Sequence, residues 1–149
     1  MKNNEHAPKK QRELTDNMVK DKFPLELRLQ QMKPNNKGYN YLFHYPYEGW
    51  DGTEYRVEIK YRDATTKFDI TPSQENGCDI FGLVNKNGEL WFLSNKEYMS
   101  NCEEHSFCNK GYKGKSKQLS IKKFKELATE DIFDIVEDNS IIDYGVLPI

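Results

Sequence analysis

Two continuous apolar runs constrain the fold of this chain more than any other feature. They cover residues 79–84 and 90–93, and a polar stretch that ends in Asn87-Gly88 joins them. Asn-Gly between two short apolar runs is a strong signal for a β-hairpin. Because both runs are apolar on both faces, we expect the two strands to lie centrally in a sheet that is covered on each side.

Helices at both ends of the chain are expected to supply that cover. Residues 13–32 are predicted to be helical in two pieces, with Pro24 in the first turn of the second piece, where its missing N–H costs nothing. Leu25, Leu29 and Met32 then follow the spacing of one buried stripe. Further helices are predicted over residues 120–128 and from Thr129 as N-cap. Their predicted buried positions are Ile121, Phe124, Leu127, Ala128, Ile132, Phe133, Ile135 and Val136.

The order of these elements is helix, several strands, then helices. Between the outer helices and the apolar hairpin, extended segments are predicted over residues 39–47, 56–60 and 67–70. This order predicts an α/β (α+β) fold, in which helices flank a central mixed β-sheet.

Length and charge bound the classes of function. The chain has 149 residues, which fits one domain; we expect a polar, basic arm over residues 1–12 and a single domain over residues 13–149. The net charge is −2 although 31% of the residues are charged. A nucleic-acid partner would therefore be bound by a local basic patch rather than by overall charge.

Cysteine use and hydropathy point to an intracellular protein. Three cysteines, an odd number, argue against a disulfide framework and fit a reducing cytoplasm. The chain opens with polar and charged residues rather than an apolar signal segment. No apolar run approaches the ~20 residues of a membrane span, so no membrane partner is expected. Abundant Lys, Asn, Tyr and Ile suggest an AT-rich coding source such as a bacterium or a phage.

The stretch over residues 56–60 carries the chemistry. In a strand, side chains alternate between two faces, so Glu58 and Lys60 lie on one surface. A tight turn through residues 52–55 would bring Asp51 back opposite Glu58. Two carboxylates and an ammonium group would then converge on a space the size of a hydrated divalent cation. The same alternation also fits an ordinary strand whose outer face is solvated.

The pattern Asp51-(six residues)-Glu58-x-Lys60 resembles the PD-(D/E)XK nuclease superfamily, the restriction-endonuclease fold. The short gap resembles mismatch-repair nicking enzymes and type II restriction enzymes, and the layout downstream resembles small homing endonucleases. The resemblance covers about the middle third of the chain. The proline that names the family is absent, because Gly49-Trp50 precede Asp51.

The resemblance implies a Mg²⁺-dependent DNA endonuclease, with Mn²⁺ as a substitute metal. Asp51, Glu58 and the carbonyl of Ile59 would ligate the metal, and Lys60 would orient or deprotonate the attacking water, which would leave a 5′-phosphate. Asp51, Glu58 and Lys60 are thus the predicted catalytic residues.

The family resemblance implies two further features. A glutamate from the N-terminal helical region often joins the metal ligands, which makes Glu13 or Glu26 a candidate additional acid. Cutting both strands of a duplex requires two sites, so a homodimer or a higher symmetric oligomer is expected.

A basic, glycine-containing stretch over residues 110–117 is predicted to be a loop that binds nucleic acid. Flexible lysines suit phosphate contacts and a tyrosine can stack on a base. Two arginines on the face of Glu58 are predicted to contact phosphates near the scissile bond. A merely solvated loop fits the same composition. The candidate nucleic-acid-binding residues are Arg56, Arg62, Lys110, Tyr112, Lys113, Lys115 and Lys117.

Cys102, His105 and Cys108 place two thiols and an imidazole within seven residues. A Zn²⁺ site would need a fourth ligand, for which Cys78 and His44 are candidates. The spacing differs from paired C-x-x-C motifs, so a loop with incidental reduced cysteines is the favoured interpretation and Zn²⁺ is not expected.

Two alternative functions remain open from the sequence. The chain fits a non-catalytic protein-binding inhibitor or adaptor, for example one encoded by a phage, that uses the tyrosines around residues 39–47 as a binding surface. It also fits a zinc-stabilised nucleic-acid-binding module. Convergence of Asp51 and Glu58 on one ion would separate the nuclease from both alternatives.

Overall fold

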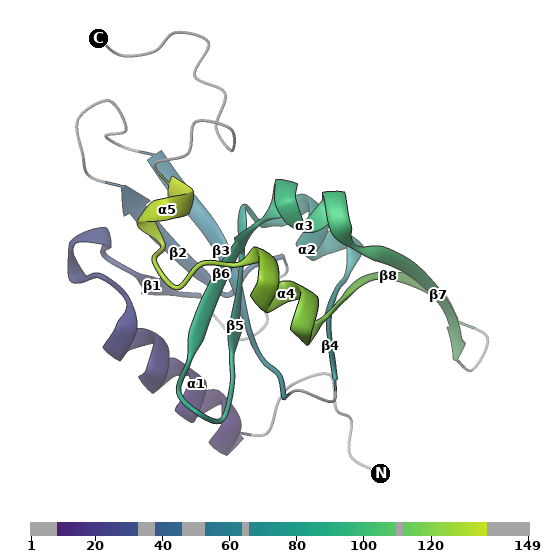
Figure 1. Cartoon of the computed structure of the whole chain (residues 1–149), viewed down its shortest axis with the longest axis horizontal. Helices are drawn as coiled ribbons and strands as arrows, with labels where there is room; N and C mark the ends of the chain where they lie inside the picture. The colour runs from purple at the N-terminus through teal and green to yellow at the C-terminus, as the bar shows by residue number, and fades with distance from the viewer. Residues whose placement is uncertain (1–8, 33–37, 46–52, 64–65, 110–111, 137–149) are drawn as a thin grey trace, which may run out of the picture.

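The computed structural model describes residues 9–32, 38–45, 53–63, 66–109 and 112–136 (Figure 1). Within these residues, a five-stranded sheet has the order β1-β2-β3-β5-β6 and a three-stranded sheet has the order β4-β8-β7. The elements are α1 (Lys9–Lys22), η1 (Leu25–Leu27), β1 (Gln30–Gln31), β2 (Tyr41–Tyr45), β3 (Thr53–Tyr61), β4 (Lys67–Ile70), α2 (Pro72–Gly77), β5 (Ile80–Val84), β6 (Leu90–Ser94), α3 (Asn95–Asn101), β7 (Glu103–Asn109), β8 (Tyr112–Ser120), α4 (Ile121–Leu127) and α5 (Phe133–Val136).

The larger sheet is mixed, as predicted. Its middle strand β3 runs antiparallel to β2 and parallel to β5, and β5 and β6 form the predicted antiparallel hairpin. Gly88 takes a positive φ of 78° in the hairpin turn, a conformation that favours glycine. The expectation that both hairpin strands lie centrally is right for β5 and wrong for β6, which ends the order of this sheet. The outer edge of β6 is paired at Phe92, which exchanges backbone hydrogen bonds with Thr129.

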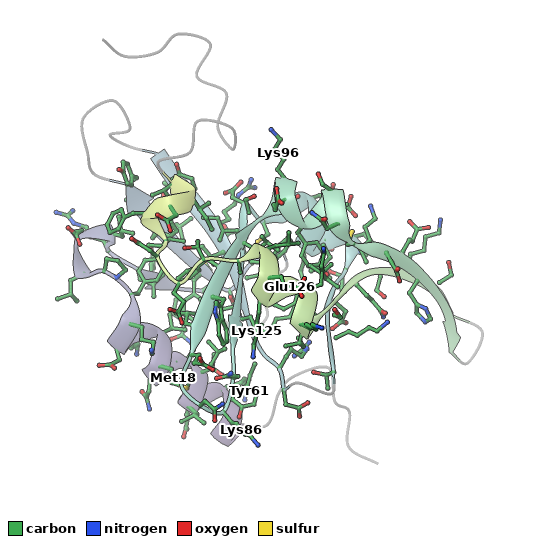
Figure 2. All side chains as sticks on the ribbon, in the orientation of Figure 1. Met18, Tyr61, Lys86, Lys96, Lys125 and Glu126 are labelled. Atoms are coloured by element: carbon green, nitrogen blue, oxygen red, sulfur yellow. The ribbon has the colours of Figure 1, made fainter. Side chains whose placement is uncertain are left out.

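Each face of the larger sheet carries its own hydrophobic core. The first core joins α1, η1 and the C-terminal segment to the sheet, with Val19, Phe23 and Val57 among its members. The second core joins β4, β8, α3 and α4 to the opposite face, and includes Phe68 and Phe124. The prediction that helices cover the sheet on both faces is confirmed, with the smaller sheet as additional cover. Lys96 on α3 and Glu126 on α4 are exposed, so the outer side of these two helices is polar (Figure 2).

The N-terminal region differs from its prediction. Helix α1 starts at Lys9, inside the stretch expected to be an arm, and the second predicted helix is only the single 3-10 turn η1. Arg28 ends that turn in the left-handed conformation, with φ of 50°, so the helical spacing stops there. Leu25 is consequently 90% exposed rather than part of a buried stripe, and the chain continues into β1.

The C-terminal helices agree with their sequence-based prediction better than the N-terminal region does. The Ser120 hydroxyl caps α4 by accepting from the Lys123 N–H at 3.1 Å, and Ile121 and Phe124 are buried as predicted. Thr129 is not the N-cap of α5, which begins four residues later at Phe133. Its hydroxyl instead accepts from the Asp131 N–H at 3.1 Å and donates to Asp134 at 2.6 Å, which stabilises a turn.

The lysine- and glycine-rich stretch predicted as a loop lies largely in strand β8, which forms a β-hairpin with β7. Strands β7 and β8 pair from Glu103 opposite Gln118 to Asn109 opposite Tyr112. Figure 1 shows this hairpin extending away from the rest of the molecule as an arm. The root of the arm is held by β4, where Asp69 lies opposite Gln118.

No helix within the described ranges has the length and apolar character that crossing a membrane requires.

Tyr98 is predicted to stabilise the second core through its hydroxyl. This residue is fully buried, and its hydroxyl lies 2.8 Å from both the Phe68 carbonyl of β4 and the Lys117 carbonyl of β8. Tyr98→Phe should lower the free energy of unfolding by about 1–2 kcal/mol, because buried carbonyls lose their donor. Urea unfolding measures this loss, with the exposed Ser100→Ala as control. Equal stability of Tyr98→Phe and wild type would contradict it.

Candidate functional site

Glu58 and Lys60 share one face of β3, as the strand alternation predicts. Their neighbours Val57 and Ile59 are buried in the first core, so the two charged side chains point toward the second core. On β5, Glu58 lies opposite Phe81, a member of that second core. The charged pair therefore sits between the larger sheet and the elements that cover it.

The carboxyl group of Glu58 is half-buried and has no hydrogen bond or ion pair to any residue that the structure describes. Burial raises its pKa to about 7, and the nearby positive charges of Lys60 and Arg62 oppose this increase without cancelling it. A carboxyl group with a pKa near neutrality and no committed partner is suited to accept a proton or to ligate a cation.

The ammonium group of Lys60 is held against β4. Its Nζ donates to the Asp69 carbonyl at 2.7 Å and lies 5.9 Å from the centre of the Phe68 ring. Burial lowers the pKa of Lys60, while the negative charges of Glu58 and Asp69 oppose the decrease. Lys60 is thus a partly desolvated cation whose head group is anchored by one backbone carbonyl.

The two arginines predicted to contact phosphates are each engaged with an aspartate. Arg62 makes an ion pair with Asp69, with Nη2 and Oδ1 3.1 Å apart. Arg56 contacts both carboxylate oxygens of Asp79, at 3.2 and 3.3 Å, and its backbone N–H donates to the same carboxylate at 2.8 Å. A bound phosphate would have to compete with these carboxylates.

The predicted tight turn through residues 52–55 is wrong. Strand β3 is continuous from Thr53, which pairs with Tyr45, because the buried Tyr55 and Val57 extend the apolar face in that direction. Glu58 lies five positions along the strand from Thr53, a distance of roughly 16 Å. Asp51 lies outside the described residues, and its role as a second carboxylate stays a prediction.

The predicted additional acids lie on elements that pack on the other face of the sheet. Glu13 belongs to α1 and Glu26 to η1, and both are exposed. These elements bury Val19 and Leu27 in the first core, whereas Glu58 faces the second. The fold therefore does not bring Glu13 or Glu26 to Glu58.

No group of three His, Cys, Asp or Glu side chains suited to a metal ion occurs in the described part of the chain. Glu58 offers one oxygen ligand of the kind that Mg²⁺ and Mn²⁺ prefer, and such ions usually keep several water molecules and take one or two carboxylates.

The candidate zinc ligands form no metal-binding group within the described ranges. Cys78 is buried in the second core, where its thiol donates to the Ile80 carbonyl at 2.8 Å, and His105 is exposed on β7. His44 lies on β2 and contacts Glu54 at 3.4 Å. The side chain of Cys108 lies outside the description.

The lysines of the arm have different surroundings. Lys117, at the root, makes a 2.9 Å ion pair with Glu75 of α2, and Lys115 lies 3.6 Å from Glu104 on the neighbouring strand. Lys110 and the side chains of Tyr112 and Lys113 fall outside the described set. The contact with Glu75 makes Lys117 an anchor of the arm.

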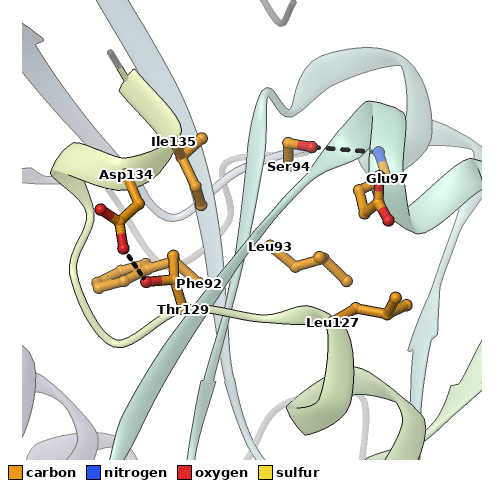
Figure 3. Close-up of a pocket in the computed structure, with 8 residues that line it drawn as sticks. All are labelled: Phe92, Leu93, Ser94, Glu97, Leu127, Thr129, Asp134 and Ile135. Carbon is orange, nitrogen blue, oxygen red and sulfur yellow. Dashed lines mark hydrogen bonds between the residues drawn. The ribbon is translucent and has the colours of Figure 1, made fainter. Parts of the chain in front are cut away.

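A shallow pocket lies elsewhere, between β6 and the helices α3, α4 and α5 (Figure 3). Three of its polar side chains are engaged in hydrogen bonds: Asp134 accepts from the Thr129 hydroxyl, and Ser94 caps α3 by accepting from the Glu97 N–H. Neither Glu58 nor Lys60 lines it.

Three residues at the site were not predicted from the sequence. Asp69 and Asp79 hold the two arginines, and Asn40 binds the backbone of Ile59 from the start of β2. Alternating apolar residues predicted a strand at residues 67–70, which includes Asp69. No local sequence signal indicated that this strand would pack against the Glu58–Lys60 face of β3.

Comparison with known proteins supports the fold. No protein-family model matches the chain, and no curated protein matches it significantly in sequence. Among solved structures, it is similar to Hjc from Archaeoglobus fulgidus, a Holliday junction resolvase from an archaeal hyperthermophile, with a TM-score of 0.54 and 10% identity. The match covers 87% of this chain and 97% of the resolvase. The predicted class, a central mixed sheet flanked by helices, is therefore confirmed.

The raised pKa of Glu58 predicts a pH-dependent stability. Because the folded-state pKa of about 7 exceeds the ordinary value of 4.5, this group stabilises the fold below about pH 4.5. That contribution is lost as the pH rises through about 7. Urea unfolding of wild type and Glu58→Gln across pH 4–8 should show the variant gaining relative stability over this window, by up to roughly 3 kcal/mol. A stability difference that is independent of pH would contradict the raised pKa.

Proposed function

We propose that this protein is a divalent-metal-dependent DNA endonuclease of the PD-(D/E)XK type. The observation that carries the proposal is Glu58, half-buried with a pKa of about 7, beside Lys60 on the middle strand of a mixed sheet. The fold is shared with a Holliday junction resolvase, which belongs to the superfamily that the Glu58-x-Lys60 pattern resembles.

Glu58 is proposed as the central metal ligand, with Asp51 as the second carboxylate. The carbonyl of Ile59 accepts a hydrogen bond from Asn40 at 2.9 Å, and a carbonyl oxygen has a second lone pair with which it would ligate the metal. Bound Mg²⁺, or Mn²⁺ in its place, would supply the charge that polarises the phosphodiester and acidifies a water molecule.

Lys60 is proposed to contact the attacking water or the scissile phosphate. Its ammonium group is already partly desolvated, which strengthens its interaction with developing negative charge. To reach the substrate, Nζ must exchange the Asp69 carbonyl for a phosphate or water oxygen.

DNA is the proposed substrate, and the arm formed by β7 and β8 is its proposed flanking contact. A two-stranded ribbon fits the major groove of B-DNA, and lysines neutralise phosphates. The proposed contacts are Arg56, Arg62, Lys110, Tyr112, Lys113 and Lys115, whereas Lys117 anchors the arm through Glu75. Cutting both strands would require a homodimer or a higher symmetric oligomer.

One observation favours a second candidate, a non-catalytic DNA-binding protein that keeps the nuclease fold. Among the described residues, Glu58 belongs to no group of three His, Cys, Asp or Glu side chains that could hold a metal ion. In this alternative the basic residues still bind DNA, and removing divalent metal changes nothing.

Cleavage tests the proposal directly. Wild-type protein with Mg²⁺ or Mn²⁺ should cut plasmid or branched DNA, and Glu58→Ala or Lys60→Ala should reduce the rate by at least ~100-fold, because each group acts on the reacting phosphate. The matched control is Glu54→Ala on the same strand, whose carboxylate is exposed and contacts His44. Full activity of either site variant would refute its assigned role, and inactive wild-type protein on all these substrates would favour the binding protein.

Metal binding should depend on pH in a defined direction. A protonated carboxyl group cannot ligate a cation, so Mn²⁺ affinity should increase about tenfold per pH unit up to about pH 7 and level off above it. Calorimetric titration with Mn²⁺ between pH 5.5 and 8 measures this dependence. An Mn²⁺ affinity that does not change with pH, or that is unchanged in Glu58→Ala, would exclude Glu58 as a ligand.

A further inference from the structure

We infer that Asn40 is a positioning residue for the Glu58–Lys60 pair, an inference that rests on the proposed function. Asn40 immediately precedes β2. Its side-chain Nδ2 donates to the Ile59 carbonyl at 2.9 Å, and its Oδ1 accepts from the Ile59 N–H at 2.8 Å. Ile59 is the residue between the two proposed catalytic side chains, so one carboxamide binds both polar backbone groups at the centre of the site.

The backbone of Asn40 is fixed as well. Its N–H donates to the Val57 carbonyl at 3.0 Å, and its carbonyl accepts from the Met32 N–H at 2.9 Å. All the polar groups of Asn40 are therefore hydrogen-bonded, and they connect the end of β1, the start of β2 and the middle of β3. The side chain thus extends the hydrogen-bonding pattern between β2 and β3 by one pair of bonds.

Ile59 is also confined from the other neighbouring strand. It lies opposite Gly82 on β5, and a Cβ at Gly82 would approach the Ile59 Cγ1 to 2.8 Å. The absence of a side chain at Gly82 lets the Ile59 side chain pack into the first core at close range. Two independent contacts thus hold the peptide segment from which Glu58 and Lys60 project.

A carboxamide meets the requirements of this position. It offers one donor and one acceptor side by side, which matches the C=O and N–H of a single residue. Aspartate would keep the acceptor, lose the donor and add negative charge near Glu58. Leucine has nearly the same shape and would leave the Ile59 backbone groups without this partner. Misplacement of catalytic groups by about 1 Å can cost a factor of about 100 in rate.

The experiment compares Asn40→Leu and Asn40→Asp with the matched variant Asn95→Leu. Asn95 is also a half-buried asparagine whose Nδ2 donates to two backbone carbonyls, those of Glu75 and Cys78, both at 2.9 Å. Replacing the Asn95 side chain therefore removes two side-chain-to-backbone hydrogen bonds, as Asn40→Leu does, but not at Ile59. Circular dichroism and urea unfolding establish that each variant is folded before the comparison.

Two readouts need neither DNA nor metal. Hydrogen exchange of the Ile59 amide should accelerate at least ~10-fold in Asn40→Leu and stay unchanged in Asn95→Leu. The carboxyl pKa of Glu58, followed by NMR, should shift in both Asn40 variants, and upward in Asn40→Asp because of the added like charge. In the cleavage assay, Asn40→Leu should lower kcat by ~100-fold and leave KM within a few-fold.

The outcomes separate the two proposals. If Ile59 exchange and Glu58 titration respond to Asn40→Leu no more than to Asn95→Leu, Asn40 is an ordinary structural residue and the inference is overturned. A loss of kcat equal in Asn40→Leu and Asn95→Leu also overturns it. If both readouts respond but wild-type protein cuts no DNA, the clamp on Ile59 stands and the endonuclease proposal fails.

Discussion

The alternation of side chains along β3 between two cores is the constraint on which the rest of the structure depends. Val57 and Ile59 fill the first core, so Glu58 and Lys60 must face the second, where β4 covers them. Partial burial of this charged pair sets its chemistry, because desolvation raises the pKa of Glu58 and lowers that of Lys60. A solvated strand face would leave both groups near their ordinary pKa values and would give them no evident function.

The strands around the site keep its charged groups in defined places. Asp69 on β4 makes an ion pair with Arg62 through its carboxylate and accepts a hydrogen bond from Lys60 through its carbonyl. Gln118 of β8, at the root of the arm, lies opposite Asp69. The proposed catalytic lysine is thus separated from the proposed DNA-binding arm by one strand. If the β7–β8 arm binds DNA beside the cleavage site, it does so next to β4, the strand that anchors Lys60.

Local patterns predicted the elements whose burial is encoded within a few residues. The β5–β6 hairpin, the helix capped by Ser120, the strand at residues 67–70 and the shared face of Glu58 and Lys60 all follow from apolar spacing and turn chemistry. Features that depend on tertiary pairing were missed. The polar sequence of β7 and β8 gave no apolar period, and the left-handed Arg28 ended a helix that Pro24 and its spacing had favoured. Asn40 reaches Ile59 only because β2 pairs with β3 in one register, which no short stretch of sequence specifies.

A crystal structure of the protein soaked with Mn²⁺, with the ion located by anomalous scattering, shows directly whether Glu58 is a metal ligand. If Glu58 holds the catalytic metal, a single strong Mn²⁺ peak should lie within about 2.0–2.4 Å of its carboxylate, a range typical of oxygen ligands to such ions, with a second carboxylate oxygen on the same ion. Mn²⁺ bound elsewhere, with no ion at Glu58, would contradict the proposed role of Glu58. The shared fold would then belong to a protein that binds without hydrolysing.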